Sequence, residues 1–88
     1  MAQSKQSPER TRRNQAFGDV VRQRRLKAGL SQETLALECD LHPTYISMLE
    51  RGVRQPSLET IFRLAGCLGM RPARLVAAVE ERLTGNKG

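Results

Sequence analysis

The chain of 88 residues has few aromatic side chains and no long apolar segment. Aromatic residues make up 3% of the sequence and Trp is absent, so the 39% of hydrophobic residues must form a mainly aliphatic core. No apolar run approaches the roughly 18 residues that a membrane-spanning helix needs, and the N-terminus lacks the apolar stretch of a signal peptide. These absences predict a soluble, cytoplasmic protein with no membrane partner, and the length predicts one domain.

Residues that carry catalytic or metal chemistry are also scarce. The sequence has one His and two Cys, no Gly-rich phosphate loop, and no cluster of Cys and His at metal-ligand spacing. We therefore expect no enzymatic activity, no metal, no cofactor and no small-molecule substrate. Cys39 and Cys67 lie far apart among apolar residues, and in a reducing compartment we expect them to fill the core as free thiols.

Acidic residues are outnumbered, and the excess of positive charge is unevenly placed. The formal net charge is +6, and residues 1–28 carry +6, residues 29–56 carry −2 and residues 57–88 carry +2. A basic chain of this kind favours an anionic partner, or else a solvated basic surface that only aids solubility. Nucleic acid is favoured over an anionic membrane because no strongly hydrophobic amphipathic helix accompanies the charge.

Apolar residues recur at spacings of three and four, which predicts helices throughout and an all-α fold. We expect five helices, at about 14–28, 31–40, 43–51, 57–68 and 72–83. Residues 1–13 are polar, basic and without periodicity, so they are predicted to form a flexible arm before a domain at 14–84 and a frayed tail at 85–88. The residues predicted to face inward from the first four helices are Phe17, Val20, Val21, Ala28, Leu35, Ala36, Cys39, Leu41, Ile46, Leu49, Leu58, Ile61, Phe62, Ala65 and Leu68.

The second and third predicted helices form the most informative feature. Each is about two turns long, and a turn of four residues at 40–43 joins them, which is the pattern of a helix-turn-helix whose second helix enters the DNA major groove. On the third helix, Ile46 and Leu49 face inward. The opposite face carries residues at spacings of three, four and seven that could contact base edges: Thr44, Ser47, Met48 and Arg51.

Three sequence blocks extend this prediction to a family. Residues 30–36 (LSQETLA), 45–52 (YISMLERG) and 56–61 (PSLETI) resemble, in order and spacing, the Xre family of lambda-repressor-like helix-turn-helix regulators. The resemblance covers about residues 17–75. It implies a five-helix lambda-repressor-like domain that binds palindromic double-stranded DNA as a homodimer and regulates transcription.

The resemblance also implies roles for individual residues. Gln32 would contact a phosphate through its backbone N–H, aided by the helix dipole, and Arg51 and Arg54 would add phosphate contacts. Arg25 and Glu50 match a partly buried ion pair that orients the recognition helix. The complete set of residues at DNA-contacting positions of the family is Gln32, Pro43, Thr44, Tyr45, Ser47, Met48, Arg51 and Arg54. The Tyr45 hydroxyl could lie near a phosphate, or its ring could pack at the edge of the core.

The chain departs from the family pattern at three positions in the turn. Asp40 replaces a Gly and His42 replaces a Ser or Thr cap, and these changes predict a slightly strained turn with His42 as a poor cap or an extra donor to DNA. Pro43 replaces a Gln or Arg that reads bases in many relatives. We therefore expect Thr44, Ser47 and Met48 to read bases, partly through thymine methyl groups.

The last helix and the basic N-terminus complete the expectations. Four residues form an apolar stripe that is wider than one small core needs, and they predict the homodimer interface: Leu75, Val76, Val79 and Leu83. Arg12 and Arg13 could follow DNA or belong to a disordered tail.

The small size of the chain and residues 43–47 (PTYIS) resemble those of stand-alone controllers of restriction–modification systems and of phage repressors. The controllers tend to have Arg at position 43, where this chain has Pro43. The alternative function is an antitoxin-type protein-interaction module.

Overall fold

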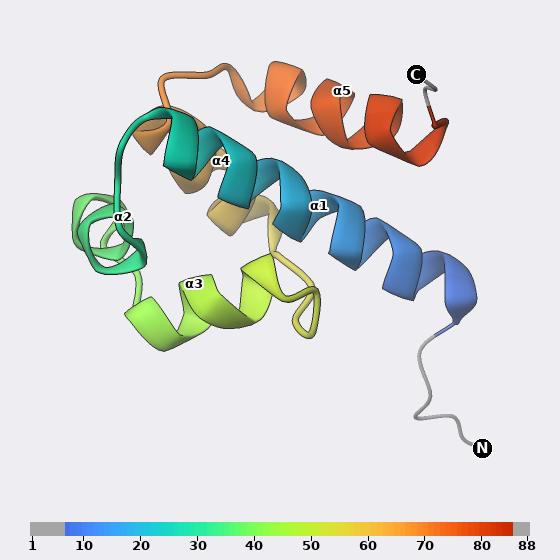
Figure 1. Cartoon of the computed structure of the whole chain (residues 1–88), viewed down its shortest axis with the longest axis horizontal. Coiled ribbons are helices and arrows are strands. Elements are labelled where there is room, and N and C mark those ends of the chain that lie inside the picture. The colour runs from blue at the N-terminus through green and yellow to red at the C-terminus, as the bar shows by residue number, and fades with distance from the viewer. Residues whose placement is uncertain (1–6, 86–88) are drawn as a thin grey trace.

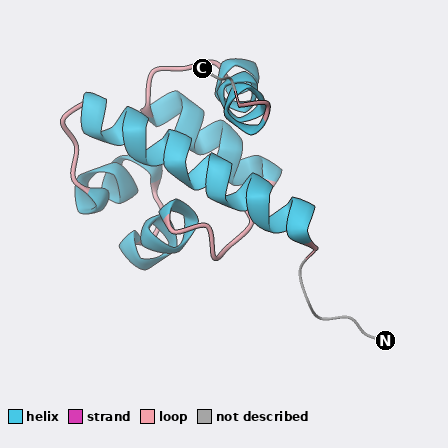
Figure 2. Ribbon diagram, turned by 45° about the vertical axis from the view of Figure 1, so that its right-hand side comes forward, coloured by secondary structure: helices cyan, strands magenta, loops and turns pink. Residues whose placement is uncertain are grey.

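The computed structural model describes residues 7–85 and contains five α-helices joined by short loops (Figure 1; Figure 2). The helices are α1 (Pro8–Lys27), α2 (Gln32–Cys39), α3 (Pro43–Glu50), α4 (Leu58–Cys67) and α5 (Pro72–Leu83). Within the described range there is no strand, which confirms the predicted all-α class. Figure 1 shows α5 and α3 on opposite sides of α1, and α1 contacts both of them.

The first helix begins at Pro8, so the prediction of a flexible arm is wrong for residues 8–13. Ser7 is the N-cap, and its hydroxyl oxygen accepts a hydrogen bond of 3.1 Å from the backbone N–H of Arg10. Pro8 fits the first helical position because it has no N–H to leave unpaired, and Glu9 complements the positive end of the helix dipole. Residues 1–6 of the predicted arm and 86–88 of the predicted tail lie outside the described residues.

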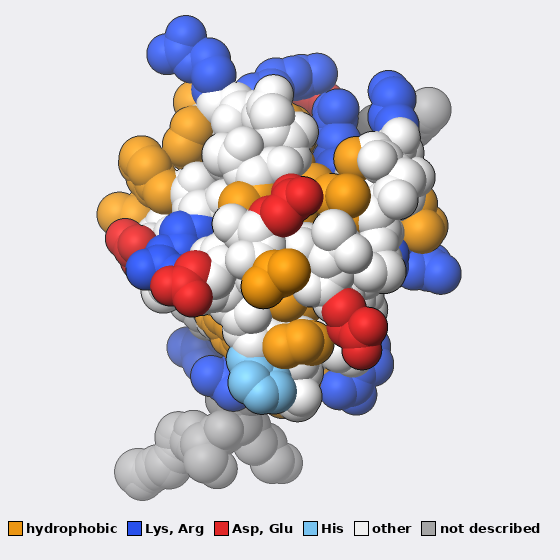
Figure 3. All heavy atoms as spheres, turned by 90° about the vertical axis from the view of Figure 1, so that its left-hand side faces the viewer, with side chains coloured by type: hydrophobic (Ala, Val, Ile, Leu, Met, Phe, Trp, Pro, Cys, Tyr) orange, Lys and Arg blue, Asp and Glu red, His pale blue; other side chains and the backbone are white. Residues whose placement is uncertain are grey.

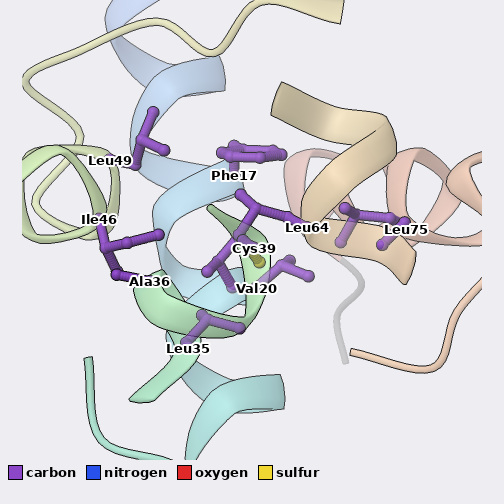
Figure 4. Packing of buried hydrophobic residues seen from close by; sticks show 11 residues of the cluster. Phe17, Val20, Leu35, Ala36, Cys39, Ile46, Leu49, Leu64 and Leu75 are labelled. Carbon is purple, nitrogen blue, oxygen red and sulfur yellow. The ribbon is translucent and has the colours of Figure 1, made fainter. Parts of the chain in front are cut away.

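An aliphatic core joins all five helices (Figure 4). Phe17 is the aromatic residue among its buried members, as expected for a chain so poor in aromatics. The other buried hydrophobic members of this cluster are Val20, Val21, Leu35, Ala36, Cys39, Ile46, Leu49, Leu64, Ala65 and Leu75. The predicted inward faces of α2 and α3 are therefore confirmed, while Leu41, Ile61 and Leu68 are half-buried against the cluster.

The inward face of α4 differs from the prediction. Leu58 and Phe62 were expected in the core, but they are 70% and 55% exposed, and Leu64 is fully buried instead. Apolar residues surround more than half of α4, so spacing alone does not select its buried face. Ala28 is also exposed rather than buried, because it is the C-cap residue beyond the last turn of α1.

Both cysteines are free thiols in the core region, as predicted. Cys39 is buried at the end of α2, and Cys67 is half-buried at the end of α4. Burial, and then the neighbouring Cys67 thiol, raise the pKa of Cys39 to about 12. Cys39 therefore remains a neutral thiol at physiological pH, which is the form expected of a residue that packs rather than reacts.

Helix α5 is attached to α1 by polar contacts at the C-terminal end of α5. The Arg12 guanidinium donates to the backbone carbonyl of Leu83 over 3.3 Å, and Arg82 pairs with Asp19 at 3.2 Å. Arg12 is thus part of the folded domain, and not of a disordered tail.

Gly18 permits the closest approach between two helices. A Cβ atom at this position would collide with the backbone carbonyl oxygen of Leu49 and would lie 2.6 Å from that of Glu50. Since both obstacles are backbone atoms of α3, no side chain can move to make room. The absence of a Cβ at position 18 therefore sets how closely α1 packs against α3, the predicted recognition helix.

We expect Gly18→Ala to destabilise the protein by about 1–3 kcal/mol, because α1 would have to move away from α3. The matched control is Gly66→Ala, since a Cβ there meets nothing within 4 Å and Ala favours the interior of α4. That control should stabilise by roughly 0.5–1 kcal/mol. Urea unfolding of the two variants measures both effects, and equal stability of the two would contradict this account of the α1–α3 contact.

Candidate nucleic-acid interface

Helices α2 and α3 form the predicted helix-turn-helix. The connecting turn begins at Asp40, which has a left-handed backbone with φ 58° and ψ 45°. Asp adopts this conformation less readily than Gly, so the position carries some of the predicted strain. The Arg63 guanidinium donates to the carbonyl of Asp40 over 3.2 Å and to that of Cys39 over 3.4 Å. These bonds from α4 satisfy carbonyls at the end of α2 and hold the turn in place.

His42 caps α3, so the prediction that it is a poor cap is wrong. Its Nδ1 atom accepts a hydrogen bond of 3.2 Å from the backbone N–H of Thr44. Imidazole nitrogen is not among the usual N-cap acceptors, but the extended backbone at His42, with φ −78° and ψ 138°, brings it within range. Pro43 then occupies the first helical position, where it leaves no N–H unpaired.

The outer face of α3 presents the side chains that were predicted to read bases. Thr44 is exposed, whereas Ser47 and Met48 are half-buried, and Ile46 and Leu49 are fully buried on the opposite face. Arg51 follows the last residue of the helix and is exposed. The hydroxyl groups of Thr44 and Ser47 can donate or accept hydrogen bonds, and the thioether and methylene groups of Met48 can contact a thymine methyl group.

Tyr45 packs at the edge of the core, and it links α3 to α4. Its hydroxyl lies 3.1 Å from the Thr60 hydroxyl, which also accepts a bond of 3.0 Å from the hydroxyl of Ser57, the α4 N-cap. The guanidinium of the loop residue Arg54 lies 5.4 Å from the centre of the Tyr45 ring, which is within the range of a cation–π contact. Of the two alternatives for Tyr45, the core-edge one describes this structure, and the aromatic ring supports Arg54.

A buried ion pair joins α1 to α3, as the resemblance implied. Arg25 Nε and Nη2 donate to the two carboxylate oxygens of Glu50 over 2.7 and 2.9 Å, and the two side chains are only 9% and 3% exposed. The hydrogen bond to Glu50 raises the pKa of Arg25 above its ordinary value. Arg25 also donates to the carbonyl of Leu30 over 2.8 Å, so one guanidinium ties the α1–α2 loop to the recognition helix.

Gln32 extends this ion pair to α2, a contact that sequence reasoning missed. Its side-chain amide donates to Glu50 over 3.0 Å, so the predicted phosphate contact is left to its backbone N–H. Ser31 caps the helix by accepting from the N–H of Thr34, and the first N–H groups of a helix have no acceptor within it. The role of Gln32 toward phosphate remains a prediction. A Gln eighteen residues from a Glu carries no spacing signal that could have revealed their contact.

The charge around the helix-turn-helix is not uniformly positive. Figure 3 shows acidic side chains scattered over one face of the molecule, with most Lys and Arg side chains around its edge. Glu33 and Glu38 are exposed on α2, and Arg51 and Arg54 are exposed around the end of α3. The exposed acidic side chains of α2 therefore offset part of the positive charge of Arg51 and Arg54 around the helix-turn-helix.

Two other kinds of site are absent from residues 7–85. No group of three or more His, Cys, Asp or Glu side chains in this range could hold a metal ion. No helix in the same range is long and apolar enough to cross a membrane.

An apolar surface lies apart from α3, on α4 and α5. Leu58, Phe62 and Val76 are 70%, 55% and 49% exposed and line a shallow cavity of about 450 Å³. We call the surface formed by these three residues the α4–α5 surface. Among the predicted dimer residues, Leu75 is fully buried within its own chain and offers no contact surface, so that assignment is wrong. Val79 and Leu83 are half-buried.

Comparison with known proteins agrees with this geometry. Residues 21–75 match the helix-turn-helix family. The chain is 54% identical over 61 residues to the control protein C.BamHI of Bacillus amyloliquefaciens, and the match covers 68% of this chain and 75% of that protein. The solved structure of the restriction-modification controller protein C.AhdI from Aeromonas hydrophila is 42% identical, with a TM-score of 0.68 and coverage of 70% and 94%.

A second solved structure extends the similarity over nearly the whole chain. The hypothetical transcription factor NHTF from Neisseria is 30% identical, has a TM-score of 0.73, and is covered to 95% by 94% of this chain. The fold, the exposed face of α3 and these relatives define a DNA-binding transcriptional regulator. The chain belongs to the helix-turn-helix family, in its lambda-repressor-like or Xre branch.

We expect Arg25→Ala and Glu50→Ala each to lower stability by about 3–5 kcal/mol, because each leaves the other charge buried without its partner. The double variant should be little worse than either single one, and a double-mutant cycle by urea unfolding measures the coupling. Arg74→Ala is a matched control, since its pair with Glu81 is exposed on both sides and should contribute little. Additive losses at Arg25 and Glu50 would contradict a coupled pair.

Proposed function

We propose that the chain is a controller-type transcription regulator that binds a palindromic operator as a homodimer in the cytoplasm. The observation that carries this proposal is the outer face of α3, where Thr44 is exposed and Ser47 and Met48 are half-buried, opposite the fully buried Ile46 and Leu49. The relatives named as control proteins support the controller type, despite Pro43 in place of the Arg expected there. The named relatives are control proteins and a transcription factor, which favours this proposal over the antitoxin alternative.

We propose different DNA contacts for different residues, according to the chemistry of their side chains. Thr44, Ser47 and Met48 read base edges, whereas Arg51, Arg54 and the backbone N–H of Gln32 bind phosphates. Tyr45 supports Arg54 through its ring, which orients the guanidinium before DNA arrives. We assign no catalytic role to the protein, because the relatives that it resembles are regulatory proteins.

We expect Thr44→Ala and Met48→Ala to lower discrimination between operator and altered duplexes by about 1–3 kcal/mol per misread base pair. Their slopes of log affinity against log salt should stay unchanged, because neither side chain contacts phosphate. Arg51→Gln and Arg54→Gln should instead weaken binding to all duplexes. Each substitution should flatten the slope by about 1.8, because the homodimer loses two phosphate contacts at about 0.9 each.

The operator for these measurements is obtained by selection from a random duplex pool, where we expect half-sites about 10 bp apart. Arg74→Gln is the control, because Arg74 is on α5, across α1 from the recognition helix (Figure 1). Its salt slope should equal that of the unchanged protein. If the selection yields no preferred sequence, the proposal that this chain binds DNA sequence-specifically is wrong.

The homodimer is proposed to form through the α4–α5 surface. Three large apolar side chains exposed side by side are unusual on a small monomer, and a twofold axis through the surface would bury both copies of each. A protein that makes few base contacts per subunit also gains specificity when a dimer binds two half-sites, because the number of base contacts doubles.

We expect Phe62→Glu to convert the dimer to monomer, because two carboxylates would be buried at the interface. Sedimentation at tens of micromolar protein measures this change. Leu37→Glu is the matched control, since Leu37 is 82% exposed on α2, outside the α4–α5 surface, and should leave the dimer intact. An unchanged protein that sediments as a monomer, both alone and on the selected operator, would refute the dimer.

A further inference from the structure

The hydrogen bond that caps α3 determines which nitrogen of the His42 ring carries the proton. Nδ1 accepts the bond of 3.2 Å from the backbone N–H of Thr44, and a ring nitrogen that accepts a hydrogen bond has no proton of its own. In the neutral imidazole the proton is therefore on Nε2, at the end of the ring away from the backbone. Within residues 7–85, Nε2 has no hydrogen-bond partner, and His42 is exposed. The cap thus leaves one N–H donor available to a ligand.

The position of His42 determines what that ligand is. His42 immediately precedes α3, and the N-terminal residues of a recognition helix are those that contact base edges in the major groove. Pro43 and Thr44, which follow it, are exposed as well. His42 therefore belongs to the same exposed end of α3 as Thr44, for which a base contact is already proposed.

This end of α3 has few other donors. Pro43 has no backbone N–H and no polar side-chain group, and the N–H of Thr44 is used by the cap. The Tyr45 hydroxyl bonds to Thr60. The Thr44 hydroxyl can accept as well as donate, so it does not by itself distinguish acceptors from donors on DNA. An imidazole N–H in a fixed tautomer can only donate, and it makes that distinction.

We propose that His42 is a specificity-determining residue, whose Nε2–H donates to a guanine in each half-site of the operator. In the major groove, guanine presents two neighbouring acceptors, O6 and N7, and no donor. Cytosine presents an amino donor, adenine has an amino donor beside its acceptor, and thymine has a methyl group beside its acceptor. A group that can only donate therefore favours guanine. The inference rests on the proposed function, because it requires α3 to lie in the major groove.

The cap also prepares His42 for this contact. The bond from the N–H of Thr44 holds the ring in one orientation before DNA arrives, so less side-chain freedom is lost on binding. A neutral ring neutralises no phosphate, so the contact releases no counterions. We therefore expect His42 to contribute to affinity and base preference without changing the dependence of affinity on salt.

Two substitutions separate the cap from the donor. His42→Ser keeps a cap acceptor, because Ser is among the preferred N-cap residues, but it removes the imidazole N–H, whereas His42→Ala removes both. We expect each variant to bind the selected operator about 100-fold more weakly, because the homodimer loses two hydrogen bonds worth about tenfold each. The salt slope should stay unchanged. The melting temperature should fall by several degrees in His42→Ala and not in His42→Ser.

Ser7→Ala is the matched control, because it removes the N-cap of α1, which lies outside the helix-turn-helix. It should lower the melting temperature about as much as His42→Ala does, and it should bind the operator as the unchanged protein does. This control separates loss of a cap from loss of a DNA contact.

Selection from a random duplex pool gives a second measurement. The operators selected by the unchanged protein and by His42→Ser should differ at one position in each half-site. At that position we expect the unchanged protein to prefer guanine roughly tenfold over the other bases, and His42→Ser to show a preference of about twofold or less.

NMR tests the hydrogen bond directly, because His42 is the only His in the sequence and its imidazole signals need no assignment. The proton on Nε2 should become visible when the protein binds the selected operator, since a hydrogen bond to a base slows its exchange with water. It should not become visible with a random duplex.

Three outcomes would overturn this inference and leave the proposed function intact. In the first, the unchanged protein selects an operator but His42→Ser binds it equally well, which would make His42 a cap alone. In the second, the two proteins select the same bases at every position. In the third, His42→Ser flattens the salt slope, which would assign the ring to a phosphate. If the unchanged protein selects no sequence at all, the proposed function is wrong, and this inference is wrong with it.

Discussion

The bidentate ion pair between Arg25 and Glu50 is the interaction on which the arrangement of the DNA-facing elements depends. It joins α1 to α3 directly, and it reaches α2 through Gln32 and the α1–α2 loop through the carbonyl of Leu30. Four backbone segments therefore converge on two side chains with little access to water. A buried pair of this kind adds little net stability compared with apolar packing. Its bidentate geometry and its bonds to Gln32 and Leu30 favour the observed orientation of α3 relative to α1 and α2.

Packing around the pair reinforces the same orientation. Gly18 brings the backbone of α1 against the carbonyl oxygens of Leu49 and Glu50, so the ion pair forms where two helices are already as close as they can be. His42 and Ser57 then cap α3 and α4, and Arg63 satisfies the carbonyls at the end of α2. The helix-turn-helix is thus defined by polar contacts at its ends and by apolar packing at its centre.

Much of this architecture could be predicted from the sequence, because helix periodicity, caps and terminating glycines are local signals. Family resemblance added the Arg25–Glu50 pair, whose partners are too far apart for spacing to connect them. The buried face of α4 was mispredicted because apolar residues surround that helix. The start of α1 was missed because Ser7-Pro8 is a cap signature that is also typical of a flexible segment. Contacts such as Gln32 with Glu50 depend on tertiary structure and have no local signature.

The chain of hydroxyl groups from Tyr45 through Thr60 to Ser57 has a mechanical consequence. It connects the recognition helix to the cap of α4, and α4 contributes to the proposed dimer surface. Tilting α3 would break the bond between the Tyr45 and Thr60 hydroxyls, so this contact resists movement of α3 relative to the start of α4. In a twofold assembly, the distance between the two recognition helices then becomes a fixed length, and DNA whose half-sites do not match it must itself twist or bend to bind.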